Sequence, residues 1–218
     1  MPVNPADPAD AVRYPLRADR ARRTHQALVT AARELFAEAG YAATTIEMLA
    51  RRAGTGRATV FTSVPGGKPQ LLTEARDQAI AGDDEPVPIP QRSWFTDAMA
   101  QTDPRELLRR QAANYRRIHE RAARLEQALA TAAATDPALA ELDAEARRQR
   151  HLGAGFVARR LGELGALSDA ETAPDTIYAL ASPGVYLLLT GDREWSPDRY
   201  QDWLADRLIG SLLNPDTT

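Results

Sequence analysis

Residues 44–72 constrain the fold more than any other stretch, because they predict two short helices joined by a tight turn. Thr44 and Glu47 have the spacing of a capping box, in which each side chain bonds a free backbone N–H at a helix start. Gly54 ends that helix, since glycine readily adopts the left-handed geometry of a tight corner. A second short helix follows, with Val60 as its inward residue. This pattern is typical of a helix-turn-helix, whose second helix enters the DNA major groove.

The segment also resembles a known family. The marks that it shares are, in chain order, Ala31–Tyr41, Thr44-Thr45, Ala53-Gly54, Ala58–Phe61 and Gly67–Leu72. Their order and spacing are similar to those of the DNA-binding domain of tetracycline-repressor (TetR) family regulators. The resemblance, with the helix signals along the chain, implies an all-α protein of about nine helices. An N-terminal three-helix helix-turn-helix domain would precede a helical C-terminal domain for ligand binding and dimerisation.

Three positions depart from the family's pattern. Gly56 stands where a serine usually caps the recognition helix, a change that costs only a few tenths of a kcal/mol. Phe61 replaces a tyrosine whose hydroxyl commonly reaches a phosphate, and residues 62–65 lack an aromatic pair. These departures affect individual phosphate contacts and leave the expected fold unchanged.

Arg57 and Thr59 are the predicted base readers, because arginine pairs with guanine and the threonine methyl packs on thymine. The resemblance implies phosphate contacts for Thr44, Thr45 and Lys68, although Thr44 could serve only as a helix cap. Phe61 either contacts the DNA or packs beneath the helix. The full predicted DNA-binding set is Thr44, Thr45, Arg57, Ala58, Thr59, Phe61, Ser63 and Lys68.

The charge is distributed unevenly along the chain. The whole chain carries −3, whereas residues 1–76 alone carry +4 and the remainder carries −7. A basic end on an acidic body is expected of a protein that presents one end to phosphates. Ordinary variation of surface charge is the alternative. Arg20, Arg22 and Arg23 would either reach the DNA or form a solvated helix start.

Proline and glycine divide the chain into four predicted segments. Residues 1–18 form a disordered N-terminal arm, and residues 19–81 the helix-turn-helix domain with a connecting fourth helix that begins at Lys68-Pro69. Within residues 82–92, every second residue of the middle part is a proline, so this segment is expected to form an extended linker. Residues 93–218 form a helical regulatory and dimerisation domain.

Helix signals in the last segment are strong. The predicted helices run from Asp103 to about Arg121, from about Ala123 to Ala134, from Asp136 to about Leu164, from Thr172 to Thr190 with a kink at Pro183-Gly184, and from Ser196 to about Leu213. The last two are apolar over a wide arc, which indicates deep burial or a partner surface. In the family, the corresponding helices form a four-helix bundle between two subunits, so a homodimer is expected. Its predicted interface consists of Leu180, Leu187, Leu188, Tyr200, Trp203, Leu204, Leu208 and Leu212.

Composition excludes several classes of protein. The chain has no cysteine, hence no disulfide or thiolate site, which fits a cytoplasmic protein. It has no apolar run long enough for a membrane span. No metal-ligand motif occurs, so neither a metal nor a cofactor is expected. Ser182, Asp175 and His151 could be assembled into a catalytic triad, but such sets arise by chance, and the protein is predicted not to be an enzyme.

Aromatic residues after the linker could line a ligand pocket between helices or simply fill the core. The predicted pocket residues are Trp94, Phe95, Tyr115, His119, Phe156, Tyr178 and Tyr186. The expected function is a DNA-binding regulator, a repressor released from its operator by a small apolar effector. A regulator controlled by a protein partner or by no ligand is one alternative, and a helical enzyme with an incidental helix-turn-helix is the other. The sequence does not specify the operator, the effector or the regulated genes.

Overall fold

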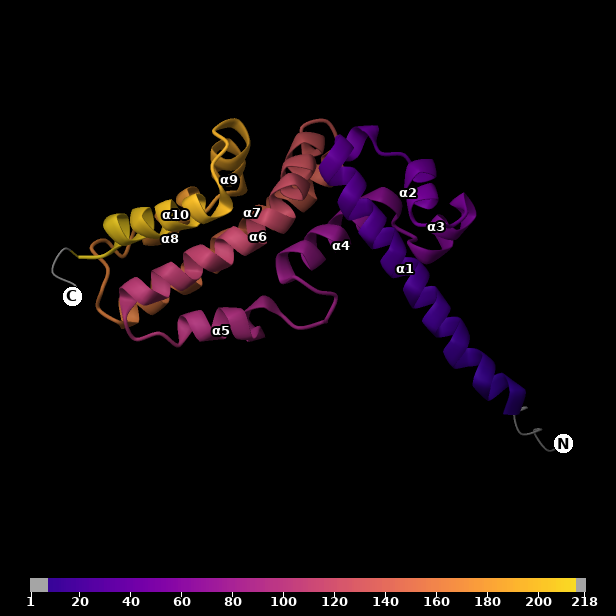
Figure 1. Cartoon of the computed structure of the whole chain (residues 1–218), viewed down its shortest axis with the longest axis horizontal. Coiled ribbons are helices and arrows are strands. Elements are labelled where there is room, and N and C mark those ends of the chain that lie inside the picture. Colours follow the sequence, from indigo (N-terminus) through magenta and orange to yellow (C-terminus); the bar gives the residue numbers. More distant parts are fainter. Residues whose placement is uncertain (1–7, 215–218) are drawn as a thin grey trace. The chain divides into compact units, whose positions relative to one another are not determined.

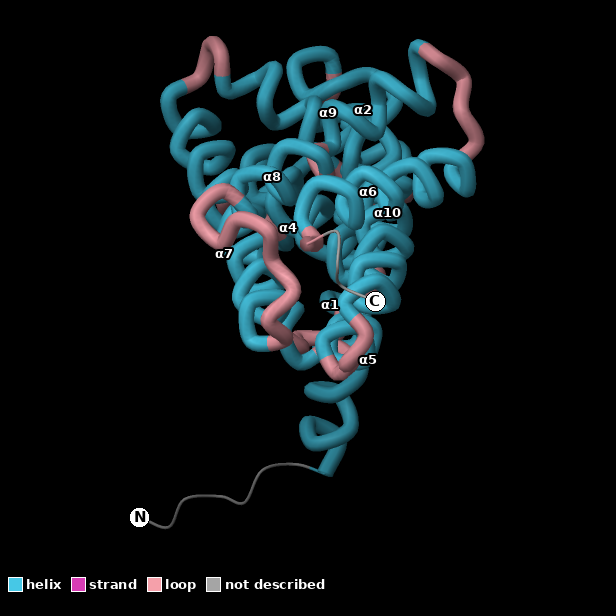
Figure 2. The backbone as a smooth tube through the Cα atoms, turned by 90° about the vertical axis from the view of Figure 1, so that its left-hand side faces the viewer, coloured by secondary structure: helices cyan, strands magenta, loops and turns pink. Residues whose placement is uncertain are grey.

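The computed structural model describes residues 8–214, with side chains from residue 18 onward. The expected all-α class is confirmed: the tube in Figure 2 is helical for most of its length, and the described residues contain no strand beyond one isolated bridge between Leu167 and Leu213. The chain divides into two compact units, Met1–Ala75 and Arg76–Thr218. Within the described part of the chain, no helix has the length and apolarity needed to cross a membrane.

The first unit contains α1 (Pro8–Ala43), α2 (Ile46–Arg52), α3 (Arg57–Ser63) and the start of α4 (Gly67–Ala81), which continues into the second unit (Figure 1). Helix α1 is interrupted at Gly40, whose φ of 78° lies outside the helical region. The sequence predicts a first helix from about Asp19 to Ala39 that stops at Gly40, and the interruption at this glycine confirms that stop.

Helix α1 begins earlier than the sequence predicts. The arm was expected to extend to residue 18, but residues from Pro8 onward are helical, and residues 1–7 lie outside the described residues. Proline suits the first helical position, and the alanine, arginine and leucine residues that follow favour a helix. The proline-rich composition of this segment wrongly indicated an arm without helix up to residue 18.

The core of the first unit comes from the inward faces of its helices. Side chains of α1, α2, α3 and α4 meet there without solvent exposure, among them Leu28, Phe36, Leu49, Val60, Leu71 and Leu72. Burying each of these side chains contributes roughly 1.5–3 kcal/mol relative to leaving it in water. The four helices thus share one core, which holds the helix-turn-helix in place.

The second unit is a helical bundle built on two long helices. Its elements after α4 are η1 (Ile89–Gln91), α5 (Ser93–Met99), α6 (Pro104–Ala133), α7 (Pro137–Glu163), α8 (Ala173–Leu180), α9 (Pro183–Leu187), the π-helical turn η2 (Leu188–Asp192) and α10 (Pro197–Leu212). Helices α6 and α7 lie side by side, and α10 and α9 pack on α6 while α8 packs on α7 (Figure 1).

Side-chain caps begin the main helices of this unit where the sequence predicts. The carboxylates of Asp103 and Asp136 accept bonds from backbone N–H groups of α6 and α7, and the Ser196 hydroxyl does so for α10. The predicted break before Pro183 is also present. However, α6 is one helix of 30 residues, and the predicted break between Arg121 and Ala123 is absent. No glycine or proline interrupts this alanine-rich stretch, so nothing ends the helix there.

The segment after α4 is an ordered loop around Arg92. This side chain is buried, and it donates to the carbonyl oxygens of Val87 and Glu85 at 3.0 and 2.9 Å and to the Asp83 carboxylate at 2.6 Å. The hydrogen bond from Arg92 holds the pKa of Asp83 below its usual value. Residues 82–88 are irregular, but Ile89–Gln91 forms a 3₁₀ turn, so the wholly extended linker predicted for residues 82–92 is wrong in its last part.

Candidate nucleic-acid interface and ligand cavity

The turn between α2 and α3 has the geometry expected of a helix-turn-helix. Gly54 has a φ of 67°, and its backbone N–H and that of Thr55 donate to carbonyl oxygens at the end of α2. A residue with a Cβ would be strained at this φ. Gly56 begins α3 without any side-chain cap, which confirms the weak cap expected there.

Helix α3 buries one residue and exposes the others. Val60 has no solvent exposure, whereas Arg57 and Ala58 are exposed, Thr59 is partly exposed and 48% of Phe61 is accessible. Of the two placements that the sequence allowed for Phe61, the structure has the ring facing outward and not packed beneath the helix. The exposed face carries a guanidinium, a hydroxyl, methyl groups and a ring, which match the groups presented in a major groove.

Arg57 is paired in the absence of DNA. Its Nη1 lies 2.9 Å from the Glu47 carboxylate, and both side chains are more than half exposed. Water screens an exposed pair of this kind, so releasing Arg57 toward a base would cost little. The sequence analysis did not find this pair, because it assigned Glu47 to a capping box.

The capping residue of α2 is Thr45, and Thr44 has another role. The Thr45 hydroxyl accepts a bond from the Met48 N–H at 3.1 Å. The Thr44 hydroxyl instead donates to the carbonyl oxygens of Gly40 and Leu35, and the residue has no exposed surface. The predicted phosphate contact of Thr44 is therefore wrong for this conformation, since a fully buried hydroxyl cannot reach a ligand. The predicted capping box of Thr44 and Glu47 is therefore replaced by a single cap from Thr45 to the Met48 N–H.

Lys68 lies in the first turn of α4. Its ammonium donates to the Tyr41 carbonyl oxygen at 2.9 Å and lies 4.2 Å from the centre of the Tyr41 ring. Partial burial lowers its pKa. These contacts hold the ammonium beside the end of α1 and use one of its three donors, which leaves two for a phosphate. Ser63, the last predicted contact, is half-buried at the end of α3.

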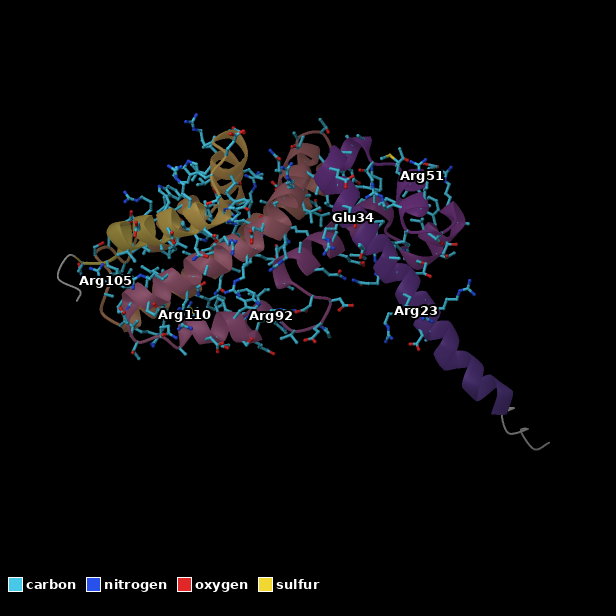
Figure 3. The ribbon with its side chains drawn as sticks, viewed as in Figure 1. Arg23, Glu34, Arg51, Arg92, Arg105 and Arg110 are labelled. Carbon is cyan, nitrogen blue, oxygen red and sulfur yellow. The ribbon has the colours of Figure 1, made fainter. Side chains whose placement is uncertain are left out.

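Two polar groups connect the helices of this unit. Arg52 of α2 binds the carboxylates of Glu34 and Glu38 on α1 at 2.7 and 3.3 Å, and Figure 3 labels Glu34 on that helix. His25 of α1 lies between the Ser63 carbonyl oxygen at 3.1 Å and the Glu74 carboxylate at 2.7 Å. His25 therefore connects α1 with the end of the recognition helix and with α4. The basic residues Arg20, Arg22 and Arg23 are exposed on α1, and Figure 3 labels Arg23 there.

The second unit contains a cavity of about 510 Å³ between α4, α5, α6 and α7. Four of the predicted pocket residues, Trp94, Phe95, Tyr115 and Phe156, line it. The Phe95 ring meets those of Trp94 and Phe156 edge to face, with ring centres 6.2 and 6.5 Å apart. Aromatic walls in a cavity of this volume suit a small molecule.

The other three predicted pocket residues lie elsewhere. His119 and Tyr186 are buried in an aromatic cluster with Tyr200, and the His119 Nδ1 lies 3.2 Å from the Tyr200 hydroxyl. Burial lowers the pKa of His119 to about 3. Tyr178 stacks under the Arg150 guanidinium at 3.7 Å. These three residues are part of the packed interior or its edge, and the pocket assignment does not hold for them.

Sequence reasoning missed the charged groups of the cavity. Arg76 of α4, Glu126 of α6 and Arg150 of α7 line it together with the aromatic rings. The Arg76 side chain is only 7% exposed, and its Nη2 lies 3.4 Å from a Glu126 carboxylate oxygen. Fifty residues separate this pair in the chain, so no local pattern could have signalled it.

The predicted interface residues fall into two groups. Tyr200, Leu204, Leu208 and Leu212 are at most 1% exposed and pack into the core of their own unit. Their assignment to a partner surface is wrong, because the wide apolar arc of α10 faces the bundle. By contrast, 52% of Leu188 is exposed, and the partly buried members are Leu180, Leu187 and Trp203.

Among the described residues, no group of histidine and carboxylate side chains is arranged to hold a metal ion. The residues of the hypothetical triad have other roles: the Ser182 hydroxyl caps α9, and His151 pairs with Asp175 at 2.8 Å on the surface.

Comparison with known proteins identifies the first unit. Residues 28–74 match the family model described as bacterial regulatory proteins, tetR family. Over this segment the chain is similar to the DNA-binding domain of TetR-family regulators. The match covers the C-terminal part of α1 from residue 28 onward, both helices of the helix-turn-helix and the first half of α4. No curated protein matches the chain.

Solved structures share the fold over nearly the whole chain. A putative transcriptional regulator from Saccharomonospora viridis in complex with choline is 20% identical, with a TM-score of 0.67 over 90% of this chain and 99% of that one. NalD, the secondary repressor of the MexAB-OprM multidrug efflux pump in Pseudomonas aeruginosa, is 20% identical, with a TM-score of 0.64 over 89% and 99% of the two chains. SmeT of Stenotrophomonas maltophilia in complex with triclosan is 18% identical, with a TM-score of 0.61 over 89% and 94%.

Proposed function

We propose that the protein is a TetR-family DNA-binding regulator and a homodimeric repressor. It binds a double-stranded DNA operator through α3 and leaves it when a small, largely apolar molecule occupies the cavity of the second unit. The observation that carries the proposal is the recognition helix, in which Val60 is anchored while Arg57 and Phe61 are exposed, within the segment that matches the family model. Such a protein acts where the bacterial chromosome is, in the cytoplasm.

The DNA contacts divide into two kinds. Arg57, Thr59 and Phe61 read base edges, because their side chains occupy the exposed face of α3. Thr45 and Lys68 stand at the starts of α2 and α4, where backbone N–H groups and the ammonium can bind phosphates. Contacts of the first kind set the operator sequence, and contacts of the second kind set the register.

Dimerisation rests on the exposed apolar residues near the C-terminal end. Leu188 in η2 is half exposed, and Trp203 on α10 is only partly buried. A two-fold dimer suits a helix-turn-helix protein, since two recognition helices then read two half-sites spaced by a helical turn of DNA.

Replacing Leu188 with glutamate should give monomers and abolish tight operator binding, because a charge cannot be buried unpaired in an apolar interface. Val87→Glu is the matched control, since this apolar side chain of the loop after α4 is 36% exposed. Light scattering should find a dimer for the wild type and the control. A monomeric wild type at micromolar concentration would exclude the dimer.

Effector control rests on the cavity and on α4. The helix runs unbroken from Lys68, beside the presumed phosphate contact, to Arg76 and Ile80 in the cavity wall. A ligand that displaces the second part of α4 therefore acts on the same rigid element that carries Lys68. Such coupling requires different affinities of the ligand for the two states and is typically about 1–3 kcal/mol. The drug-sized ligand named for the SmeT complex supports this reading of the fold.

A thermal-shift screen of apolar compounds, followed by operator release, tests effector control. Ligands that raise the melting temperature should release DNA over the same concentration range, as linkage requires. If a compound raised the melting temperature but did not release DNA, the protein would bind ligands without being controlled by them. Absence of any stabilising apolar compound would favour the rival in the same class, a regulator controlled by a protein partner or by none. Failure to bind any duplex in a salt-dependent way would favour the enzyme alternative.

A further inference from the structure

The charged groups of the cavity define the chemistry of the ligand more narrowly than its aromatic walls do. Arg76 lies at one side, with a side chain that is 7% exposed. Its Nη1 binds the Asp77 carboxylate at 2.9 Å and its Nη2 the Glu126 carboxylate at 3.4 Å. Its Nε–H is buried and has no hydrogen-bond partner within the part of the chain that the structure describes. A buried, unpartnered donor of this kind is rare in folded proteins and favours an acceptor placed beside it.

A second guanidinium, that of Arg150, lines the cavity from α7. Arg150 donates from Nη1 to the Tyr178 carbonyl oxygen at 2.8 Å, and it stacks on the Tyr178 ring. Among the described residues, no carboxylate forms an ion pair with it. Arginine has five N–H donors, and the bond to the carbonyl oxygen uses one of them. At least three donors therefore remain for a ligand.

Of the carboxylates that the structure describes, Glu126 alone lines the cavity with these arginines. Burial raises its pKa, against the opposing effects of Arg76 and Arg150, so all three charges lie within range of one another. Two cations therefore face one acid in the lining of the cavity. Asp77, the other partner of Arg76, is 59% exposed and lies outside the cavity lining, where water screens its charge.

We propose that the cavity binds a monoanionic amphiphile, a molecule with an aromatic or aliphatic body and a single carboxylate. The carboxylate would lie between Arg76 and Arg150, and the body would lie against Trp94, Phe95 and Phe156. The inference rests on the proposal that this cavity holds the effector. A cation such as the choline named for the Saccharomonospora viridis structure would meet two guanidiniums here and is disfavoured.

The position of Arg76 also indicates how an anion would act on the DNA-binding unit. Arg76 belongs to α4, and its bond to Glu126 of α6 is long, at 3.4 Å. A carboxylate that accepts from Arg76 competes with Glu126 for the guanidinium. The anion therefore weakens the link between α4 and α6, whereas an uncharged body of the same shape leaves that link in place.

A matched set of compounds tests the proposal. Naphthoate, naphthamide and naphthylmethylamine share one ring system and differ in charge, as do decanoate, decanamide and decylamine. Each would be titrated into the full-length protein bound to a labelled duplex selected by the protein, and affinity would be measured by calorimetry. The carboxylate should bind at least about tenfold more tightly than its amide, as expected for a charge-assisted bond to arginine, and the amine should bind most weakly.

Two variants separate the contribution of the charge from that of the fold. Arg150→Gln should remove most of the preference for the carboxylate and leave amide binding unchanged. Glu126→Gln should strengthen carboxylate binding, because it removes the competing acid. Arg109→Gln, on the exposed side of α6, is the control and should change neither.

The outcomes distinguish this inference from the proposed function. Equal binding of carboxylate and amide, with release of DNA by both, would overturn the anion site and leave effector control standing. Preference for the amine would overturn it in favour of a cation site at Glu126. If no member of either set bound or released DNA, both the anion site and the assignment of this cavity as the effector site would fail.

Discussion

Replacing His119 with asparagine should change how the stability of the second unit depends on pH. The histidine is 3% exposed, and it lies among the rings of Tyr115, Tyr186 and Tyr200. Burial is the main cause that lowers its pKa from 6.5 to about 3, and the nearby Arg150 acts in the same direction. Asparagine can keep a polar atom near the Nδ1 position, 3.2 Å from the Tyr200 hydroxyl, but it does not titrate.

The magnitude follows from proton linkage. Because the folded pKa is depressed, the unfolded chain binds a proton between pH 6.5 and about pH 3 that the folded unit does not. The stability due to neutral His119 is complete above pH 6.5 and is lost as the pH falls toward 3. The slope is about 1.4 kcal/mol per pH unit, so the free energy of unfolding falls by about 2.5 kcal/mol between about pH 6 and pH 4. A folded pKa one unit higher would still give about 2 kcal/mol.

Urea unfolding at a fixed protein concentration measures this difference. All three tryptophans, Trp94, Trp195 and Trp203, belong to the second unit, so tryptophan fluorescence follows its unfolding alone. The variant should be less stable at neutral pH, but its stability should fall less steeply with acid than that of the wild type. Parallel curves would mean that His119 titrates while the unit is folded. That result would refute its place in the core and return it to the ligand pocket.

Two other variants test the first unit. Thr44→Val should lower the free energy of unfolding by about 1 kcal/mol, because the carbonyl oxygens of Gly40 and Leu35 lose their donor. The operator affinity of the folded variant, measured by anisotropy, should be unchanged. A specific loss of affinity would reinstate the phosphate contact. Lys68→Ala should weaken binding to all duplexes about equally and reduce the salt dependence by about one per subunit, and an unchanged slope in titrations over a salt series would refute the contact.

Local signals in the sequence predicted the helices well. Gly40 and Gly54 adopt the left-handed geometry for which only glycine is unstrained, and Asp103, Asp136 and Ser196 cap helices where expected. These signals depend on a few adjacent residues, so a single sequence contains them. The earlier start of α1 and the continuous α6 were mispredicted because helix propensity over a long alanine-rich segment outweighs weak local breaks.

Periodicity could not decide which apolar faces are buried within one chain. Tyr200, Leu204 and Leu208 follow the helical repeat of α10, and an interface would have the same repeat. Only the three-dimensional packing shows that they face α6 and the other helices of their own unit, while Leu188 is exposed. A core and a partner surface bury the same kind of side chain, so the sequence pattern is identical for both.

The candidate sites divide in the same way. Arg57, Thr59 and Phe61 could be predicted because they lie within one short helix around an apolar anchor. The cavity was only half predicted, since its aromatic residues stand out by type while Arg76, Glu126 and Arg150 do not. These charged side chains come together only when α4, α6 and α7 pack against one another. Their burial, which marks them as candidate ligand contacts, therefore depends on the fold and not on a local pattern.

The central claim is that α3 reads a specific operator sequence. The most direct measurement compares the affinity for a duplex obtained by in vitro selection with the affinity for a scrambled duplex of the same composition. The ratio of the two affinities would be determined at several salt concentrations for the wild type, Arg57→Ala and Arg147→Ala. Arg147 is an exposed arginine of α7 and serves as the charge-matched control. The wild type and the control should discriminate strongly, and Arg57→Ala should lose about 1–3 kcal/mol of discrimination. If Arg57→Ala kept the full ratio, or if the wild type bound both duplexes equally, the assigned recognition helix would be contradicted.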